Sequence, residues 1–255
     1  MRFAQADIIR LFGGSTLLTK QVLSELFRRP LYLRLIIEQI YQIGIRSLPL
    51  VFITAGSTGM VMALQFGLGL EKFGGKLYIP KIVSLSIVRE MGPVFTCLML
   101  AARVGAGIAS EIGSMTVTQQ IDAIRALGTS PIKKIVIPRV LGCLIAIPLL
   151  AVGANFVGII GGLLVGVNDL GLDPVFYMQK VLTTIWVPDF MSGFMKTPVF
   201  AGIIAITACY FGLTVKGGTQ GVGNATTRAV VTASICILVG DYFLTKLFWV
   251  IEQWL

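Results

Sequence analysis

The sequence of 255 residues contains no histidine and few charged residues. Without histidine the protein lacks the most common general base and the most common metal ligand, which excludes histidine-based catalysis. Charged residues make up 13% of the chain, against about 25% in ordinary soluble domains. The hydrophobic share is 55% and the mean hydropathy is +0.87. These values argue against a soluble protein and predict an all-α integral membrane protein with one domain over residues 1–255.

The sequence has only four cysteines and no phosphate-binding loop of the ATPase type. The four cysteines stand singly in apolar stretches, without the paired spacing of a zinc site or a disulfide framework, so no metal site is expected. No segment matches G-x-x-x-x-G-K-[ST], the loop that binds phosphates in many ATPases. If ATP drives transport here, the ATPase must be another polypeptide.

Long apolar runs predict five membrane-spanning helices, because a bilayer core needs about 20 apolar residues per helix. Residues 47–70 are uncharged over 24 positions, residues 140–168 over 29 and residues 197–215 over 19. Two further apolar runs contain charges. The predicted spans cover about 47–70, 82–102, 140–168, 197–215 and 229–251.

The distribution of lysine and arginine predicts the orientation. A cytoplasmic N-terminus places 14 of the 21 basic residues inside and six outside, as the positive-inside rule favours. Five spans then place the C-terminus outside. The net charge of +9 is explained without nucleic acid.

Charges interrupt every apolar window in residues 1–46, so this region is predicted to be amphipathic and to lie in the cytoplasmic interface. Part of it shows apolar residues near helical spacing, at Leu31, Leu35, Ile36 and Ile40. An ordinary amphipathic helix packed on the bundle is the alternative, and the two are compatible.

Small residues recur every fourth position in two of the predicted spans. They are Ala55, Gly59, Ala63 and Gly67 in the first span, and Gly158, Gly162 and Gly166 in the third. Such stripes allow close approach of helix backbones. The partner is either another span of the same chain or a second copy of the chain.

Two adjacent charges, Arg89 and Glu90, fall inside the second span, where an unpaired charge is costly. Pro93 removes a helical hydrogen bond from the carbonyl of Arg89, which predicts a kink. Counted along their spans, Arg89 and Asp241 both fall in the outer half of the bilayer core, so Arg89 is predicted to approach Asp241. Lys196 or water is predicted to balance Glu90. The charges then form either a structural ion pair or an amphiphile site in which Arg89 meets an anionic head group. A proton relay is disfavoured by the few carboxylates.

The predicted cytoplasmic loop, residues 103–139, contains a short amphipathic helix with its own boundaries. Thr116 and Gln119 have the spacing of a capping box, and Gly128 with Pro131 ends the helix. The predicted apolar face consists of Val117, Ile121, Ile124 and Leu127. Such a helix suits docking into a partner's groove, and the alternative is a helix on the membrane surface.

Several motifs between about Gly44 and Leu255 occur in an order that resembles the MlaE/YrbE-type permeases of lipid-transporting ABC systems, which work with MCE-domain proteins. They are REMGPVFTCLMLAARVGAGIASEIGSM from Arg89, QQIDAIRALGTSP from Gln119, PR at Pro138, KTPVFA from Lys196 and NATTRAVV from Asn224. One departure is Gln119, because the family usually shows glutamate in an EQIDAL-like run.

The resemblance implies a homodimeric, non-enzymatic permease of the bacterial inner membrane that moves phospholipid and supports outer-membrane lipid asymmetry. Implied partners are a cytoplasmic ABC ATPase, which would bind ATP and magnesium, a periplasmic MCE ring and a small cytoplasmic accessory protein; no cofactor is expected in this chain. The implied lipid-cavity residues are Arg89, Glu90, Lys196, Arg228, Asp241 and, less specifically, Gln65. The implied ATPase-coupling residues are Glu111, Thr116, Gln119, Gln120, Asp122 and Arg125. The rival functions are a stand-alone secondary transporter and a membrane scaffold without transport.

Overall fold

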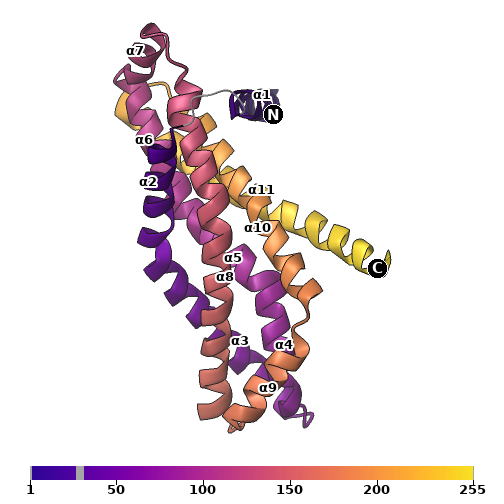
Figure 1. Ribbon diagram of the computed structural model, residues 1–255. Coiled ribbons are helices and arrows are strands. Elements are labelled where there is room, and N and C mark those ends of the chain that lie inside the picture. The colour runs from indigo at the N-terminus through magenta and orange to yellow at the C-terminus, as the bar shows by residue number, and fades with distance from the viewer. Residues whose placement is uncertain (1, 27–31, 255) are drawn as a thin grey trace. The chain divides into compact units, whose positions relative to one another are not determined.

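A computed structural model describes residues 2–26 and 32–254, and within these ranges the chain is helical and contains no strand (Figure 1). Five stretches are long and apolar enough to cross a membrane: Leu33–Glu71, Lys76–Val117, Ile132–Asn168, Val187–Leu213 and Gly218–Gln253. Each overlaps one predicted span and extends beyond it at one or both ends. The all-α integral membrane fold is therefore confirmed.

Most of the helices follow one another with short connections. They are α1 (Arg2–Leu26), α2 (Leu33–Ile43), α3 (Leu48–Glu71), α4 (Ile79–Ser86), α5 (Gly92–Leu100), α6 (Ala106–Val117), α7 (Gln120–Ala126), α8 (Ile137–Asn168), α9 (Pro174–Thr184), α10 (Val187–Leu213) and α11 (Gly218–Trp254). Three π-helical turns, η3 (Ile87–Met91), η4 (Ala101–Gly105) and η5 (Ile132–Val136), continue directly into α5, α6 and α8.

The chain divides into two compact units. The first contains the described residues of Met1–Ile43 together with Leu100–Ile145 and Ala201–Cys236. The second contains Gly44–Met99, Ala146–Phe200 and the described residues of Ile237–Leu255. The single permease domain over residues 1–255 stays a prediction.

In the first unit, the predicted loop 103–139 is much shorter than expected. The second span continues through η4 and α6 to Val117, and the third begins at Ile132. Arginine and glutamate are good helix formers, so Arg103 and Glu111 mark the end of the apolar run and not the end of the helix.

The N-terminal region of the first unit forms α1 and α2. In α2, Ile36 and Ile43 are buried and Leu35 and Ile40 are half-buried, which confirms one packed apolar face; Leu31 lies outside the described residues. The Cβ of Gln39 lies 2.8 Å from where a Cβ on Gly142 would stand, so α2 packs closely on the start of α8. Location of this region in the membrane interface stays a prediction.

In the second unit, α3 and α8 pack backbone against backbone. A Cβ added at Gly59 would overlap the carbonyl oxygen of Gly158, and one added at Gly161 would overlap the carbonyl oxygen of Gly56. The stripe on the first span therefore faces another span of the same chain, as small residues permit.

A second core of this unit joins α3, α4 and α9. Asp173 caps the start of α9, because its side chain accepts a hydrogen bond from the Phe176 N–H at 2.8 Å, and Pro174 follows as the first helical residue. The cap positions Tyr177, which is fully buried beside Val83 and Ala63. Burial raises the pKa of Tyr177 to about 12, so its phenol stays neutral at physiological pH.

Candidate functional site

The two adjacent charges of the second span lie in the π-helical turn η3. In an α-helix, residue 93 would donate its N–H to the carbonyl of Arg89, but Pro93 has none. The carbonyl of Arg89 instead accepts a hydrogen bond from Nζ of Lys196 at 3.3 Å. The predicted disturbance of the helix at Pro93 is thus a wide turn in which a side chain from α10 reaches the carbonyl of Arg89.

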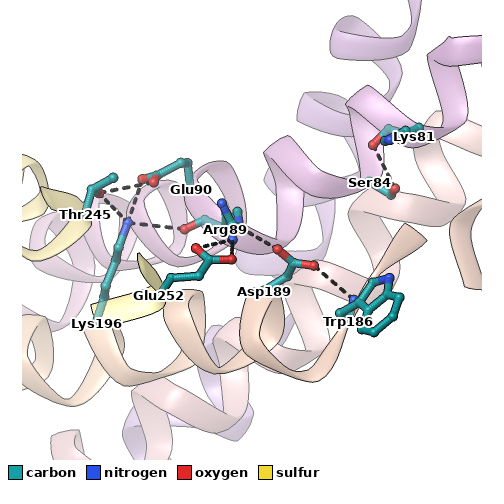
Figure 2. A network of polar contacts seen from close by, with 9 residues as sticks. All are labelled: Lys81, Ser84, Arg89, Glu90, Trp186, Asp189, Lys196, Thr245 and Glu252. Carbon is teal, nitrogen blue, oxygen red and sulfur yellow. Dashed lines mark hydrogen bonds and ion pairs between the residues drawn. The ribbon is translucent and has the colours of Figure 1, made fainter. Parts of the chain in front are cut away.

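Lys196 is the centre of the first group of contacts in this site, and its side chain is 0% exposed. Its Nζ donates to Glu90 Oε2 and to Thr245 Oγ1, each at 2.7 Å (Figure 2). The hydroxyl of Thr245 in turn donates to Glu90 Oε1 at 3.1 Å. This arrangement confirms the predicted pairing of Glu90 with Lys196.

Asp241 completes this group. Its Oδ1 lies 3.1 Å from Nζ of Lys196 and makes no hydrogen bond of its own. An ammonium group has three protons, and four acceptors lie within reach of this one: Glu90, Thr245, the carbonyl of Arg89 and Asp241. The carboxylate of Asp241 is therefore held by its attraction to the charge of Lys196.

Arg89 is the centre of a second group of contacts. Its Nε lies 2.6 Å from Oδ1 of Asp189, while Oδ2 of Asp189 accepts the Trp186 N–H at 3.0 Å (Figure 2). Nη2 of Arg89 donates to both oxygens of Glu252, at 2.7 and 2.8 Å. These contacts join the second span to the first turn of α10 and the last turn of α11.

The predicted approach of Arg89 to Asp241 is wrong, because Asp241 pairs with Lys196 and Arg89 pairs with Asp189 and Glu252. The distance of a residue from the end of its span gives depth in the membrane. It does not give the direction in which the side chain points, and two positions at similar depth can face different neighbours.

Sequence reasoning missed Asp189, Thr245 and Glu252. One signal was available for two of them: Thr245 and Glu252 follow Asp241 by four and eleven residues, which places all three on one face of a helix. Asp189 gives a weaker signal, since an acid in the first turn of a helix is common without any site.

Gln65 and Arg228 do not join the contacts in Figure 2. Gln65 is an exposed residue of α3, and Arg228 is an exposed residue of α11 in the first unit. Their roles in a lipid cavity stay predictions. Among the described residues, no group of three histidine, cysteine, aspartate or glutamate side chains is arranged to hold a metal ion.

The segment that contains the implied ATPase-coupling residues, Glu111 to Arg125, forms two helices and not the single predicted one. α6 ends at Val117, Gln119 adopts a left-handed conformation with φ of 58°, and α7 begins at Gln120. The predicted capping box is wrong, because the hydroxyl of Thr116 donates to the carbonyls of Ile112 and Gly212, both at 2.9 Å. The predicted end of the helix at Gly128 is confirmed, since this glycine has φ of +75°.

The surface of α7 is mostly exposed. Asp122 and Arg125 pair with each other at 3.2 Å, and both side chains are 70% exposed. Of the predicted apolar face, Ile121 is buried whereas Val117 and Leu127 are exposed. The helix therefore presents a mixed apolar and charged surface that no other described part of its unit covers.

Glu111, at the middle of α6, is held by the buried side chain of Arg139. Nη2 of Arg139 donates to Glu111 Oε2 at 2.9 Å, and Nη1 donates to the carbonyl of Ile135, also at 2.9 Å. This ion pair fixes α6, which leads into α7, to the start of the third span. Glu111 acts here as a positioning contact, and any direct contact with an ATPase stays a prediction.

Comparison with known proteins assigns the chain to a family. The sequence matches the family Permease MlaE over residues 36–247. A probable ABC transporter permease protein of Rickettsia conorii is 43% identical over 248 residues, covering 97% of this chain and 94% of the relative. A probable ABC transporter permease protein of Synechocystis is 38% identical over 232 residues, covering 90% and 88%.

A relative with a more specific name is the intermembrane phospholipid transport system permease protein MlaE of Haemophilus influenzae. It is 32% identical over 214 residues, covering 84% of this chain and 82% of the relative. The family match spans both the charged turn of the second span and the segment around α7. With five helical stretches able to cross a membrane, the chain belongs to the MlaE permease family.

Proposed function

We propose that this protein is the membrane permease subunit of an ATP-driven phospholipid transport system. It passes lipid between the inner membrane and a periplasmic MCE protein through a lipid-binding cavity. The observation that carries this proposal is the family match together with the relative of Haemophilus influenzae, whose name states intermembrane phospholipid transport.

The polar site of the second unit supports a lipid-handling role. Charged groups inside membrane spans commonly mark a substrate path, because they are too costly to retain without use. The side chain of Arg89 is 34% exposed and that of Glu252 is 47% exposed, so this end of the site is open to a ligand. Apolar helices beside the exposed charges of Arg89 and Glu252 suit an amphiphilic ligand.

A second copy of the chain is needed to build a cavity of sufficient size. A recess in the second unit, lined in part by Thr54, Thr58, Met91 and Thr96, encloses only about 10 Å³, which is room for about one water molecule. Pockets for drug-sized ligands have volumes of about 300–1,000 Å³. A phospholipid with two acyl chains exceeds this recess, which supports a cavity completed by a homodimer.

The proposed assembly assigns the other steps to partners. A cytoplasmic ABC ATPase binds ATP and magnesium and catalyses hydrolysis, so the permease itself is not an enzyme. A periplasmic MCE ring receives or delivers lipid, and a small cytoplasmic protein is a further candidate partner. The N-terminus lies in the cytoplasm and the C-terminus in the periplasm, in accordance with the distribution of basic residues.

The decisive experiment is purification of the tagged protein from native membranes in mild detergent, followed by mass spectrometry of proteins and lipids. We expect an ABC ATPase, an MCE protein and bound phospholipid. Recovery of the chain without these partners but with transport activity would favour a stand-alone transporter. Recovery without partners, lipid or activity would favour a scaffold.

A second experiment tests α7 as the contact with the ATPase. We expect that replacing Asp122 and Arg125 by alanine reduces stimulation of the ATPase by the permease several-fold, because the few interface residues that dominate binding cost more than about 1 kcal/mol when truncated and arginine is enriched among them. The fold should persist, since exposed ion pairs stabilise proteins by about 0–1 kcal/mol. The measurement is ATP hydrolysis by the reconstituted complex.

The exposed pair of Glu71 and Lys76, 2.8 Å apart, provides the matched control for that experiment. Alanine at both positions removes an ion pair of the same kind in the other unit. Stimulation should then equal that of the wild type. Equal stimulation in both double variants would argue against α7 as the docking helix.

A further inference from the structure

The two carboxylates that hold Arg89 differ in their surroundings. Asp189 is buried and also accepts the Trp186 N–H, so it is a fixed part of the unit. Glu252 is half exposed and places both of its oxygens on one nitrogen, Nη2 of Arg89. The open side of the guanidinium is therefore covered by an exchangeable side chain.

The site carries more negative than positive charge. Its ionisable side chains are two basic ones, Arg89 and Lys196, and four acidic ones, Glu90, Asp189, Asp241 and Glu252. With all of them ionised, the formal charge is −2. Both basic groups already pair with carboxylates, so an anionic ligand has to compete with them for the same cations.

A guanidinium binds phosphate oxygens and carboxylate oxygens with the same planar set of donors. A lipid phosphate reaching Arg89 from the open side would therefore compete directly with Glu252. The displaced carboxylate then needs a cation, because an unpaired charge beside apolar spans is costly. A head group that carries its own ammonium supplies that cation, and a glycerol head group does not.

We infer that Glu252 determines head-group specificity by occupying Nη2 of Arg89, so that the site favours zwitterionic phospholipids with an ammonium group over anionic ones. This inference rests on the proposed function in phospholipid transport. Residue 252 lies beyond the residues matched to the family, 36–247, so the family match does not imply this role.

The test compares the lipids retained by the permease complex purified in its wild-type form and as Glu252→Gln. Each preparation is exchanged into vesicles of equimolar phosphatidylethanolamine and phosphatidylglycerol, re-isolated, and its bound lipid is quantified by mass spectrometry. The wild type should retain mainly phosphatidylethanolamine. The variant should shift the ratio toward phosphatidylglycerol by about fivefold, near the upper value for a partly exposed ion pair.

Two further variants make the result specific. Glu252→Ala removes the remaining hydrogen-bond acceptor and should shift the ratio at least as far. Glu71→Gln removes one carboxylate from an exposed ion pair elsewhere in the same unit and should leave the ratio unchanged. Size-exclusion chromatography confirms that each variant is folded.

The outcomes separate this inference from the function on which it depends. Bound phospholipid with the same ratio in the wild type and both Glu252 variants would overturn the specificity role alone. A wild-type preference for phosphatidylglycerol would overturn it as well. Absence of phospholipid from every preparation would contradict the proposed lipid transport itself.

Discussion

Replacement of Lys196 by methionine should be the most damaging single change in the polar site. The ammonium lies 2.7 Å from Glu90 and 3.1 Å from Asp241, and the side chain is fully buried. Methionine preserves most of the apolar volume but leaves two carboxylates without their cation. Removing one partner of a buried ion pair typically costs about 3–5 kcal/mol. We therefore expect a large loss of folded protein in detergent.

Thermal unfolding followed by size-exclusion chromatography measures this loss. Lys180→Met is the matched control, because Lys180 is an exposed residue of α9 and contacts the ring of Phe176. The control should unfold near the wild-type temperature. Adding Glu90→Gln to Lys196→Met should restore part of the stability by removing one unpaired charge. A Lys196→Met protein as stable as the wild type would contradict the ion-pair arrangement.

Replacement of Gly59 by leucine should prevent α3 from packing on α8. A Cβ at this position would overlap the carbonyl oxygen of Gly158, which belongs to the backbone and cannot rotate away. Overpacking in a well-packed core costs about 1–3 kcal/mol even where side chains can adjust, so a clash with backbone should cost more. We expect little or no folded protein.

The same helix provides the control for this substitution. Gly69 also lies in α3, and nothing stands within 4 Å of where its Cβ would be. Gly69→Leu should therefore fold as well as the wild type. The measurement is the yield of monodisperse protein after extraction in mild detergent. Similar yields for the two variants would show that α3 and α8 do not meet through Gly59.

Hydropathy predicts the five spans because a bilayer requires long apolar stretches of definite length. It predicts helix ends less well, since a helix that leaves the bilayer continues wherever its residues favour helix. α6 is an example: Glu111 lies outside the predicted span yet in mid-helix, where Arg139 pairs with it. The predicted capping box failed for a related reason, because Thr116 lies at the end of one helix and not at the start of the next.

The charged residues of the site could be predicted from sequence where they stand as isolated charges in or beside an apolar run. Glu90 and Lys196 stand beside or within apolar runs, and each required a partner of opposite charge. Asp189 and Glu252 stand near the ends of such runs, where charges are ordinary, so their position relative to the apolar runs does not assign them to Arg89. Pairing depends on the direction of each side chain, which only the packed helices define.

The wide turn at Ile87–Met91 also changes how labelling of the second span must be interpreted. An α-helix advances by about 100° per residue, and a π-helical turn accommodates one additional residue. Side chains of α5 are therefore rotated by about 100° relative to the continuation of α4. A cysteine-accessibility series along residues 79–99 should show two separate periodic patterns with a phase jump between them. A single helical wheel drawn through the whole segment would assign lipid-facing positions of α5 to the wrong side.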